Sequence, residues 1–254
     1  MQKFDIEECG RKWKNFTEAD WQKLLADTPE IFEELSIDDW QRLLTEYPDM
    51  LEDMPVSAFS GKVWQVVLVC FSQFADKCDW QKLDGYDWSE LLQAQPQTAD
   101  RCNFDQLDGY GWSHLLKVQP QFADRCDWSK LNGFAWSMLL RVQPQFADKC
   151  DWSKLDEEEY YFSGPWSGLL KKQPQFAAKC DFNKFNGYDW SELLQEQPQF
   201  ADRCDWSKFD GYDWSRLLQE QPQFSDKCDW SKLDDDDWDG LLDIQPQFAQ
   251  FKKK

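Results

Sequence analysis

Histidine is almost absent from this sequence, which contains a single one, His114, in 254 residues. Nucleophilic catalysis by Ser–His–Asp or Cys–His requires a histidine held between a nucleophile and an orienting group, and no such grouping surrounds His114. A Gly-rich phosphate-binding loop is also missing. These absences predict a protein that is not an enzyme and takes no cofactor, in which His114 is a solvent-exposed, variable residue.

Basic residues and long apolar runs are also scarce. The chain has 28 Lys and Arg against 48 Asp and Glu, a net charge of −20. Proteins that grip phosphates need a basic stripe, so direct binding of nucleic acid or of anionic membranes is disfavoured. The most apolar segment, Val63–Phe71, is far shorter than the roughly 20 residues of a membrane span. The segment Met1–Asp5 lacks the pattern of a signal peptide. We therefore expect no membrane association and, if the chain is full length, a cytoplasmic location.

Bulky aromatic residues are abundant and recur at a fixed interval. The chain holds 16 Trp and 19 Phe. The Trp of a W-x-x-L-L motif, relaxed to Val67-Leu68 in the third case, occurs at Trp21, Trp40, Trp64, Trp88, Trp112, Trp136, Trp166, Trp190, Trp214 and Trp238. A Pro follows eight residues after each of these Trp except Trp64, where Ser72 takes its place. Cysteines recur with the same spacing as the Trp residues, at Cys78, Cys102, Cys126, Cys150, Cys180, Cys204 and Cys228. The chain is therefore a tandem array of 24-residue units. Each unit is called a coil below and is named by its Trp.

The Trp190 coil illustrates the expected local structure. Trp190, Leu193 and Leu194 fall on one stripe of a helix. Asp189 is the expected N-cap of this helix, with Glu192 as its capping-box partner.

The rest of this coil is expected to be short helical turns. Pro198 should end the first helix and open a second, short one. Asp205 is then expected to cap a single 3-10 turn over residues 206–209, and Asp210-Gly211 to form the turn into the next coil.

Stacking is needed because no such coil can bury its aromatic residues alone. The sequence predicts an all-α solenoid of about ten stacked units, each an α-helix plus short helical or 3-10 turns. We divide it into divergent N-terminal capping units (1–63), regular repeats with a six-residue insertion near 156–165 (64–237), and a C-terminal capping unit (238–254).

From about Trp21 to Phe248 the chain resembles the leucine-rich repeat variant, a bacterial 24-residue repeat that alternates α and 3-10 helices. The shared features are the unit length, the apolar pair, the following Pro and a second apolar cluster. The resemblance implies a right-handed superhelix. The Trp, Phe and Cys positions depart from that family's mostly aliphatic core, and no Cys-x-x-Cys cluster precedes the repeats, so its iron–sulfur module is not implied. The run Q-P-Q-F-A-D-K-C-D-W-S-K-L is also similar to uncharacterised Trp-rich bacterial repeats.

The cysteine and aspartate columns favour structural roles. Cysteines one coil apart are expected about 9–10 Å from one another, too far for a disulfide and unable to converge on one metal ion. We expect them to be reduced core thiols and the aspartates to be caps and turns. The run from Asp235 to Gly240 matches the start of an EF-hand calcium loop, but Pro246 stands where that loop needs Glu, so no metal is predicted and calcium stays an alternative.

Variation among the coils is concentrated at positions 3, 6 and 7, which share one helix face. We interpret this face as a partner-binding surface, with drift of exposed residues as the alternative. Its candidate residues are Glu90, Gln93, His114, Lys117, Met138, Arg141, Lys171, Glu192, Gln195 and Arg216. The insertion is expected to bulge outward as a second contact, or to be tolerated without function; it contains Glu157, Glu158, Glu159, Tyr160, Tyr161 and Phe162.

Together these features predict a non-enzymatic protein-interaction scaffold that presents a variable helix face to a protein partner. The alternative is an acidic DNA mimic that occupies a nucleic-acid-binding protein. The aspartate columns favour this alternative. It is disfavoured by an opposing column of lysines at Lys82, Lys130, Lys154, Lys184, Lys208 and Lys232.

Overall fold

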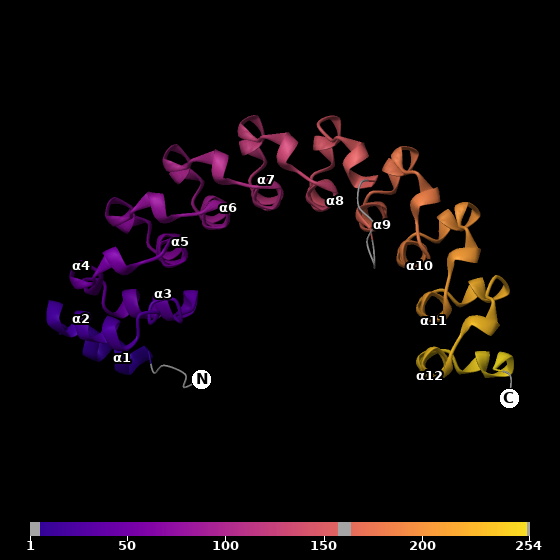
Figure 1. The fold of residues 1–254 in the computed structure, drawn as a ribbon, viewed down its shortest axis with the longest axis horizontal. Helices are drawn as coiled ribbons and strands as arrows, with labels where there is room; N and C mark the ends of the chain where they lie inside the picture. Colours follow the sequence, from indigo (N-terminus) through magenta and orange to yellow (C-terminus); the bar gives the residue numbers. More distant parts are fainter. Residues whose placement is uncertain (1–5, 157–163, 253–254) are drawn as a thin grey trace. The chain divides into compact units, whose positions relative to one another are not determined.

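A computed structural model describes residues 6–156 and 164–252 of the chain (Figure 1). In these two ranges every regular element is an α-helix or a 3-10 helix, and no strand occurs. The chain divides into two compact units, Met1–Cys126 and Asp127–Lys254, which are described separately. No helix in the described part of the chain is both long and apolar enough to cross a membrane.

The first unit contains seven α-helices among its described residues. They are α1 (Ile6–Trp13), α2 (Glu18–Asp27), α3 (Ile37–Glu46), α4 (Met50–Asp53), α5 (Gly61–Cys70), α6 (Gly85–Ala94) and α7 (Gly109–Val118). Its 3-10 helices are η1 (Val56–Ala58), η2 (Ser72–Lys77), η3 (Trp80–Lys82), η4 (Pro96–Arg101), η5 (Phe104–Gln106) and η6 (Pro120–Arg125).

The second unit repeats the pattern. Its described α-helices are α8 (Gly133–Val142), α9 (Pro165–Lys172), α10 (Gly187–Glu196), α11 (Gly211–Glu220) and α12 (Asp235–Ile244). Its 3-10 helices are η7 (Trp128–Lys130), η8 (Pro144–Asp148), η9 (Trp152–Asp156), η10 (Pro174–Lys179), η11 (Phe182–Lys184), η12 (Pro198–Arg203), η13 (Trp206–Lys208), η14 (Pro222–Asp226), η15 (Trp230–Lys232) and η16 (Pro246–Phe251).

Each unit is a solenoid in which an α-helix packs on the α-helix of the next coil. In the first unit α5 packs on α6 and α6 on α7; in the second, the contacts run from α8 through α9, α10 and α11 to α12. From α5 to α7 in the first unit, and from α8 to α12 in the second, the α-helices lie side by side along one edge and the 3-10 segments follow the other edge (Figure 1). The predicted all-α solenoid is confirmed.

The α-helices begin three residues earlier than the sequence analysis placed them. The N-cap of α10 is Asn186, and the capping box pairs Asn186 with Asp189. The assignment of Asp189 as N-cap and Glu192 as its partner was therefore wrong. Likewise Asp210 and Gly211 are the N-cap and first residue of α11, and they form no separate turn. The poor helix propensity of Gly concealed this start, although Gly is tolerated in a first turn whose N–H groups have no partner inside the helix.

The remaining turns follow the predicted pattern. Gln197 is the C-cap of α10, and Pro198 is the first residue of η12. Because of its fixed φ and missing N–H, Pro198 suits this place better than any helix interior. Asp205 then caps η13 by accepting a hydrogen bond from the Ser207 amide at 3.2 Å.

From the Trp88 coil onward, the core contains a pair of stacked aromatic rings above a leucine pair. Trp206 of η13 lies parallel to Trp214 of α11, with ring centroids 5.4 Å apart and an interplanar angle of 10°. Leu217 and Leu218 of the same helix are fully buried. Six further coils repeat this stack with Trp or Phe as the outer ring: Trp80–Trp88, Phe104–Trp112, Trp128–Trp136, Trp152–Trp166, Phe182–Trp190 and Trp230–Trp238. These stacks explain why bulky residues recur at a fixed interval.

Candidate functional site

The variable positions of the repeat lie on the α-helix face that points away from the Trp-Leu-Leu stripe, as expected from 100° of rotation per residue. From the Trp88 coil to the Trp214 coil, position 3 and most of position 6 are half-buried, whereas position 7 is exposed. In the first unit this face carries Glu90 and Gln93 on α6, with His114 and Lys117 on α7. In the second unit it carries Met138 and Arg141 (α8), Lys171 (α9), Glu192 and Gln195 (α10), and Arg216 (α11).

Exposed aromatic rings lie on the same face in each unit and were missed in the sequence analysis. Each ring follows the Gly that opens an α-helix and lies four residues before position 3. The exposed fractions are 61% for Tyr86, 52% for Tyr110, 38% for Phe134 and 55% for Tyr212, whereas Tyr188 is half-buried. The signal was the repeated aromatic residue after Gly. It was overlooked because a late helix start left Tyr188 outside the helix. We call these rings and positions 3, 6 and 7 the aromatic–variable face.

In the second unit, charged residues of this face pair across the coils. Lys171 Nζ lies 2.6 Å from Glu192 Oε2, and Arg216 donates to Glu192 Oε1 from the opposite side. All three side chains are largely covered, with exposed fractions of 17–24%. Burial opposes the charged form of Glu192, but hydrogen bonds from Lys171 and Arg216 outweigh it and hold the pKa of this carboxyl below its usual value.

Arg216 also contacts two rings of the aromatic–variable face. Its guanidinium carbon lies 4.6 Å from the Tyr188 ring centroid and 5.6 Å from the Tyr212 ring centroid. These distances place the two rings within about 10 Å of one another, which is the spacing of packed helices. Three of the predicted site residues, Lys171, Glu192 and Arg216, are thus brought together, and a cation fills the space between two tyrosines.

Different contacts occur on the aromatic–variable face of the first unit. Glu90 accepts a hydrogen bond from the Gln93 side chain at 3.2 Å. The imidazole of His114 lies 4.4 Å from the Tyr110 ring, and its Nε2 is buried without a hydrogen-bond partner in the described residues. Burial, and secondarily the charge of Lys117, lowers the pKa of His114, so this side chain is neutral at pH 7.

The invariant surface positions hold the coils together. In the Gln-Pro-Gln segment, the first Gln donates its side-chain amide to a position-6 carbonyl of the preceding coil, at 2.6–3.1 Å. The bonds run from Gln95, Gln119, Gln173, Gln197, Gln221 and Gln245 to Val69, Gln93, Arg141, Lys171, Gln195 and Gln219. The lysine column acts similarly, since Lys82, Lys154, Lys208 and Lys232 each donate to two backbone carbonyls of the preceding coil. These positions are tied to stacking and cannot vary freely.

The cysteine column consists of free thiols. Burial raises the pKa of Cys78, Cys102, Cys150 and Cys228 to about 12, and raises the pKa of Cys180 and Cys204 further. Such thiols are poor nucleophiles at neutral pH because almost none is ionised.

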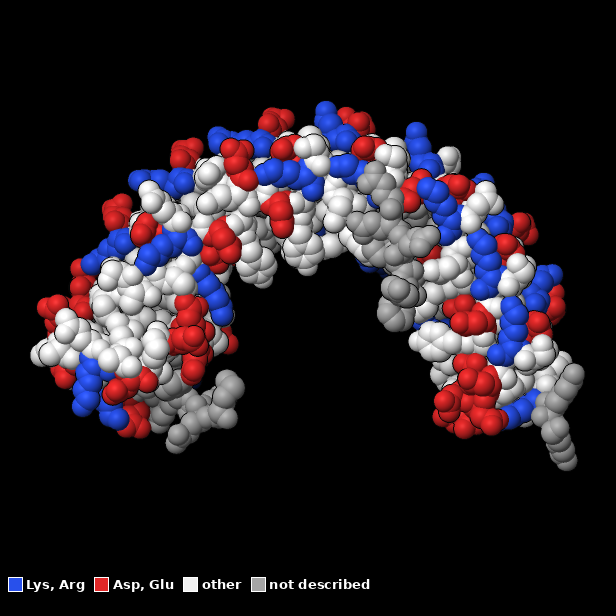
Figure 2. Space-filling view, viewed as in Figure 1, with Lys and Arg blue, Asp and Glu red and all other residues white. Residues whose placement is uncertain are grey.

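The acidic run that resembles an EF-hand loop forms the first turn of α12. Asp234 is the N-cap and Asp237 its capping-box partner. Lys252 lies 3.5 Å from Asp235 and 3.7 Å from Asp239. Acidic side chains gather over this helix (Figure 2). Among the residues that the structure describes, no group of three or more His, Cys, Asp or Glu could hold a metal ion.

No family model, curated protein or solved structure matches this chain. The aromatic–variable face therefore has to be interpreted from its own chemistry. The insertion residues from Glu157 to Phe162 lie outside the described residues.

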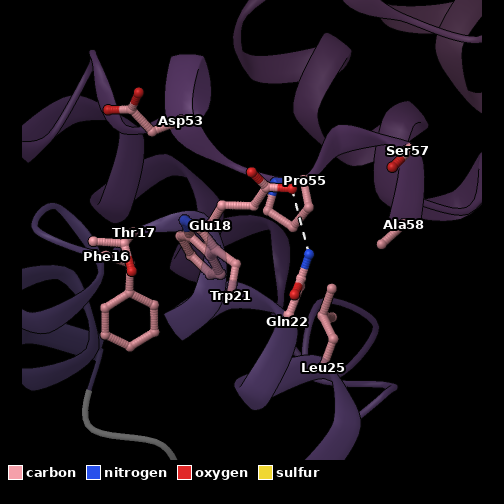
Figure 3. Close-up of a pocket in the computed structure, with 10 residues that line it drawn as sticks. All are labelled: Phe16, Thr17, Glu18, Trp21, Gln22, Leu25, Asp53, Pro55, Ser57 and Ala58. Atoms are coloured by element: carbon pink, nitrogen blue, oxygen red, sulfur yellow. Dashed lines mark hydrogen bonds between the residues drawn. The ribbon is translucent and has the colours of Figure 1, made fainter.

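The first unit also contains an open cavity beside α2 (Figure 3). It is lined by Phe16, Thr17, Glu18, Trp21, Gln22, Leu25, Asp53, Pro55, Ser57 and Ala58. Gln22 donates to Glu18 at 3.3 Å, and Phe16 packs edge-on against Trp21. The lining combines an apolar floor with two carboxylates, and it contains no paired nucleophile and base.

Proposed function

We propose that this protein is a non-enzymatic interaction scaffold whose protein partner contacts the aromatic–variable face of the α-helices. The observation that carries the proposal is the set of exposed rings beside the positions that change from coil to coil. Exposed Tyr and Phe are enriched at protein interfaces, where they supply large contact area at low entropic cost. In the coils that carry a ring, a recurring aromatic residue beside a variable neighbour would provide affinity and selectivity from the same surface.

The division between constant and variable positions supports the proposal. Side chains that bond the preceding coil, such as Gln197 and Lys208, recur in nearly every coil. Position 3 instead carries Glu90, His114 and Met138 in three successive coils. On the edge formed by the 3-10 segments, acidic and basic side chains are interspersed (Figure 2). Such an edge lacks the single-sign field that a mimic of DNA needs.

We infer also that the coil follows the plan of the leucine-rich repeat variant. The support is the 24-residue unit and the alternation of an α-helix with 3-10 segments. The resemblance concerns the plan of the coil alone and assigns no activity.

The proposal is tested by replacing exposed rings of the face together, as Tyr86→Ala, Tyr110→Ala and Phe134→Ala. A matched control replaces Asp100, Asp124 and Asp202 by Ala, three exposed residues on the 3-10 edge. Each immobilised variant captures proteins from a lysate of the source organism, and the captured proteins are quantified by mass spectrometry.

We expect at least one partner of the unchanged chain to be retained by the control and reduced about tenfold by the ring substitutions, since an interface aromatic contributes on the order of 1–2 kcal/mol. Equal capture by all three proteins, with unchanged unfolding curves, would exclude this face. A partner that duplex DNA displaces, and that the ring substitutions leave bound, would instead identify a DNA mimic.

A further inference from the structure

The second unit shows what the space between two rings of the aromatic–variable face accepts. Arg216 lies between Tyr188 and Tyr212 and pairs with Glu192. Lys171 approaches the same carboxylate from the preceding coil. Two cations thus satisfy one acidic group, and one of them stacks against the aromatic rings.

The first unit contains the same arrangement without the cations. Counting back 102 residues, Tyr86, Glu90 and Tyr110 occupy the places of Tyr188, Glu192 and Tyr212. The places of Lys171 and Arg216 are taken by two uncharged side chains, Val69 and His114. We call the three retained residues the Tyr86–Glu90–Tyr110 site; they lie on the adjacent helices α6 and α7.

In the first unit the ring of Tyr86 is accessible, with an exposed fraction of 61%, whereas His114 packs against Tyr110 with its imidazole 4.4 Å from that ring. Val69 and His114, which stand in the places of Lys171 and Arg216, provide no lysine or arginine to Glu90, which accepts a hydrogen bond from the side-chain amide of Gln93 at 3.2 Å. A guanidinium placed against Tyr86 and Glu90 would form a charge-assisted hydrogen bond with the carboxylate and a cation–π contact with the ring.

A hollow on the α5 side of Tyr86 and Glu90 extends the acidic surface. Its lining contains four carboxyl groups and two lysines. One of these lysines, Lys82, is already bound to two backbone carbonyls. This charge balance favours a basic segment running past the site.

We propose that the Tyr86–Glu90–Tyr110 site binds an arginine side chain from a basic segment of the protein partner, in the manner in which the second unit binds its own Arg216. The proposal rests on the proposed function and names the chemistry of the partner at one part of that face. Arginine is favoured over lysine because a planar guanidinium stacks on tyrosine and bonds a carboxylate with two donors at once.

The site can be observed directly in the whole chain because the sequence has only seven tyrosines. Protein labelled with 3-fluorotyrosine gives few fluorine NMR signals, which are assigned with single Tyr→Phe variants. The probe is the peptide acetyl-Gly-Arg-Gly-amide, and its control is the same peptide with citrulline, which has the shape of arginine and no charge. We expect the arginine peptide to shift the signals of Tyr86 and Tyr110 at millimolar concentration and the citrulline peptide to leave them unchanged.

One substitution adds an internal cation to the first unit, and a second removes the internal cation of the second unit. His114→Arg supplies the missing cation internally, so the arginine peptide should no longer shift Tyr86 and Tyr110. Arg216→His removes the internal cation, so Tyr188 and Tyr212 should begin to respond. Glu90→Gln should weaken binding on the order of tenfold, as expected for loss of a charge-assisted hydrogen bond.

Equal shifts with both peptides, or an undiminished response in His114→Arg, would overturn the arginine site. If the ring substitutions abolish partner capture and the arginine peptide does not bind, the scaffold proposal stands and this inference fails. If the peptide binds but capture ignores the rings, the site binds arginine and the scaffold proposal fails.

Discussion

The ammonium group of Lys208 lies 2.6 Å from the carbonyl oxygen of Asn183 and 2.6 Å from that of Phe185. Lys208 belongs to η13, and the two carbonyls belong to the end of η11 in the preceding coil. The 3-10 turn ends with carbonyls that have no partner inside the turn, so a lysine of the next coil completes it. The same contact made by Lys82, Lys154 and Lys232 makes this a general means of joining coils.

Lys208→Met should destabilise the second unit by about 1–3 kcal/mol, because it leaves two carbonyls without their charged donor while keeping the length of the side chain. The matched control is Lys227→Met. Lys227 is exposed, and it forms an ion pair with its neighbour Asp226 at 3.2 Å. The control should change the free energy of unfolding in urea by less than about 0.5 kcal/mol. Equal effects of the two substitutions would show that the lysine column does not join the coils.

Gln197→Ala should cost about 1 kcal/mol, because the Gln197 side-chain amide donates to the Lys171 carbonyl of the preceding coil at 2.7 Å. Gln199→Ala is the control in the same segment, since Gln199 is exposed and bonds only to the side chain of Gln197 among the described contacts. Urea unfolding of both variants measures the difference. A loss confined to Gln199→Ala would contradict the role assigned to the first Gln.

Gly211→Ala should destabilise the second unit by more than about 2 kcal/mol. A Cβ at Gly211 would lie 2.4 Å from the Lys232 carbonyl oxygen of the next coil, so the coils would have to separate. Gly240→Ala is the control within α12, where the nearest atom would lie 3.7 Å away. Because Ala is the better helix former, Gly240→Ala should be neutral or stabilising by up to about 1 kcal/mol. The melting temperature of Gly211→Ala should therefore fall, whereas that of Gly240→Ala should stay unchanged or rise.

Stability should depend on pH through the buried carboxyl group of Asp213. Burial raises the pKa of Asp213 to about 6, above the value of about 3.9 in an unfolded chain. The folded state therefore holds a proton that the unfolded state releases, and this contribution is present below about pH 4 and lost as the pH rises through about 6. Asp213→Asn keeps the neutral form at every pH.

Relative to Asp213→Asn, the unchanged chain should gain about 2 kcal/mol of unfolding free energy between pH 7 and pH 4. The control is Asp226→Asn, which makes the same substitution at an exposed carboxyl. Denaturant unfolding at several pH values provides both comparisons. A constant difference for Asp213→Asn would mean that this carboxyl is ionised throughout.

The sequence allowed the repeat, the all-α class and the end of each α-helix to be predicted, since these depend on spacing and on residues with one dominant effect. Pro198 both ends α10 and opens η12 because its ring permits little else. The helix start was harder to locate. Asn186 and Asp189 are both good caps, and Gly187 disfavours helix on propensity alone. The close approach of the next coil, at the Lys208 carbonyl, requires Gly at this position, and that contact depends on the packing of the coils.

Only part of the candidate site could be predicted from the sequence, because its contacts also depend on how neighbouring coils pack. The face carrying Glu192 and Arg216 followed from helical spacing, but the pairing of these two residues required the register between coils. Tyr188 was overlooked as a surface residue because the helix was expected to begin after it. A ring in the first helical turn can be exposed when the core position lies two residues further on, as Trp190 does.

The pairing of Lys171, Glu192 and Arg216 makes the order of the coils matter. Removal of the 24 residues from Trp190 to Asp213 would preserve the repeat pattern but would bring the coil of Arg216 directly against that of Lys171, with two like charges facing each other. Duplication of the same block would instead oppose two copies of Glu192. Gain or loss of whole repeats is thus disfavoured at this point of the array, even though the stacked aromatic core would accept either change.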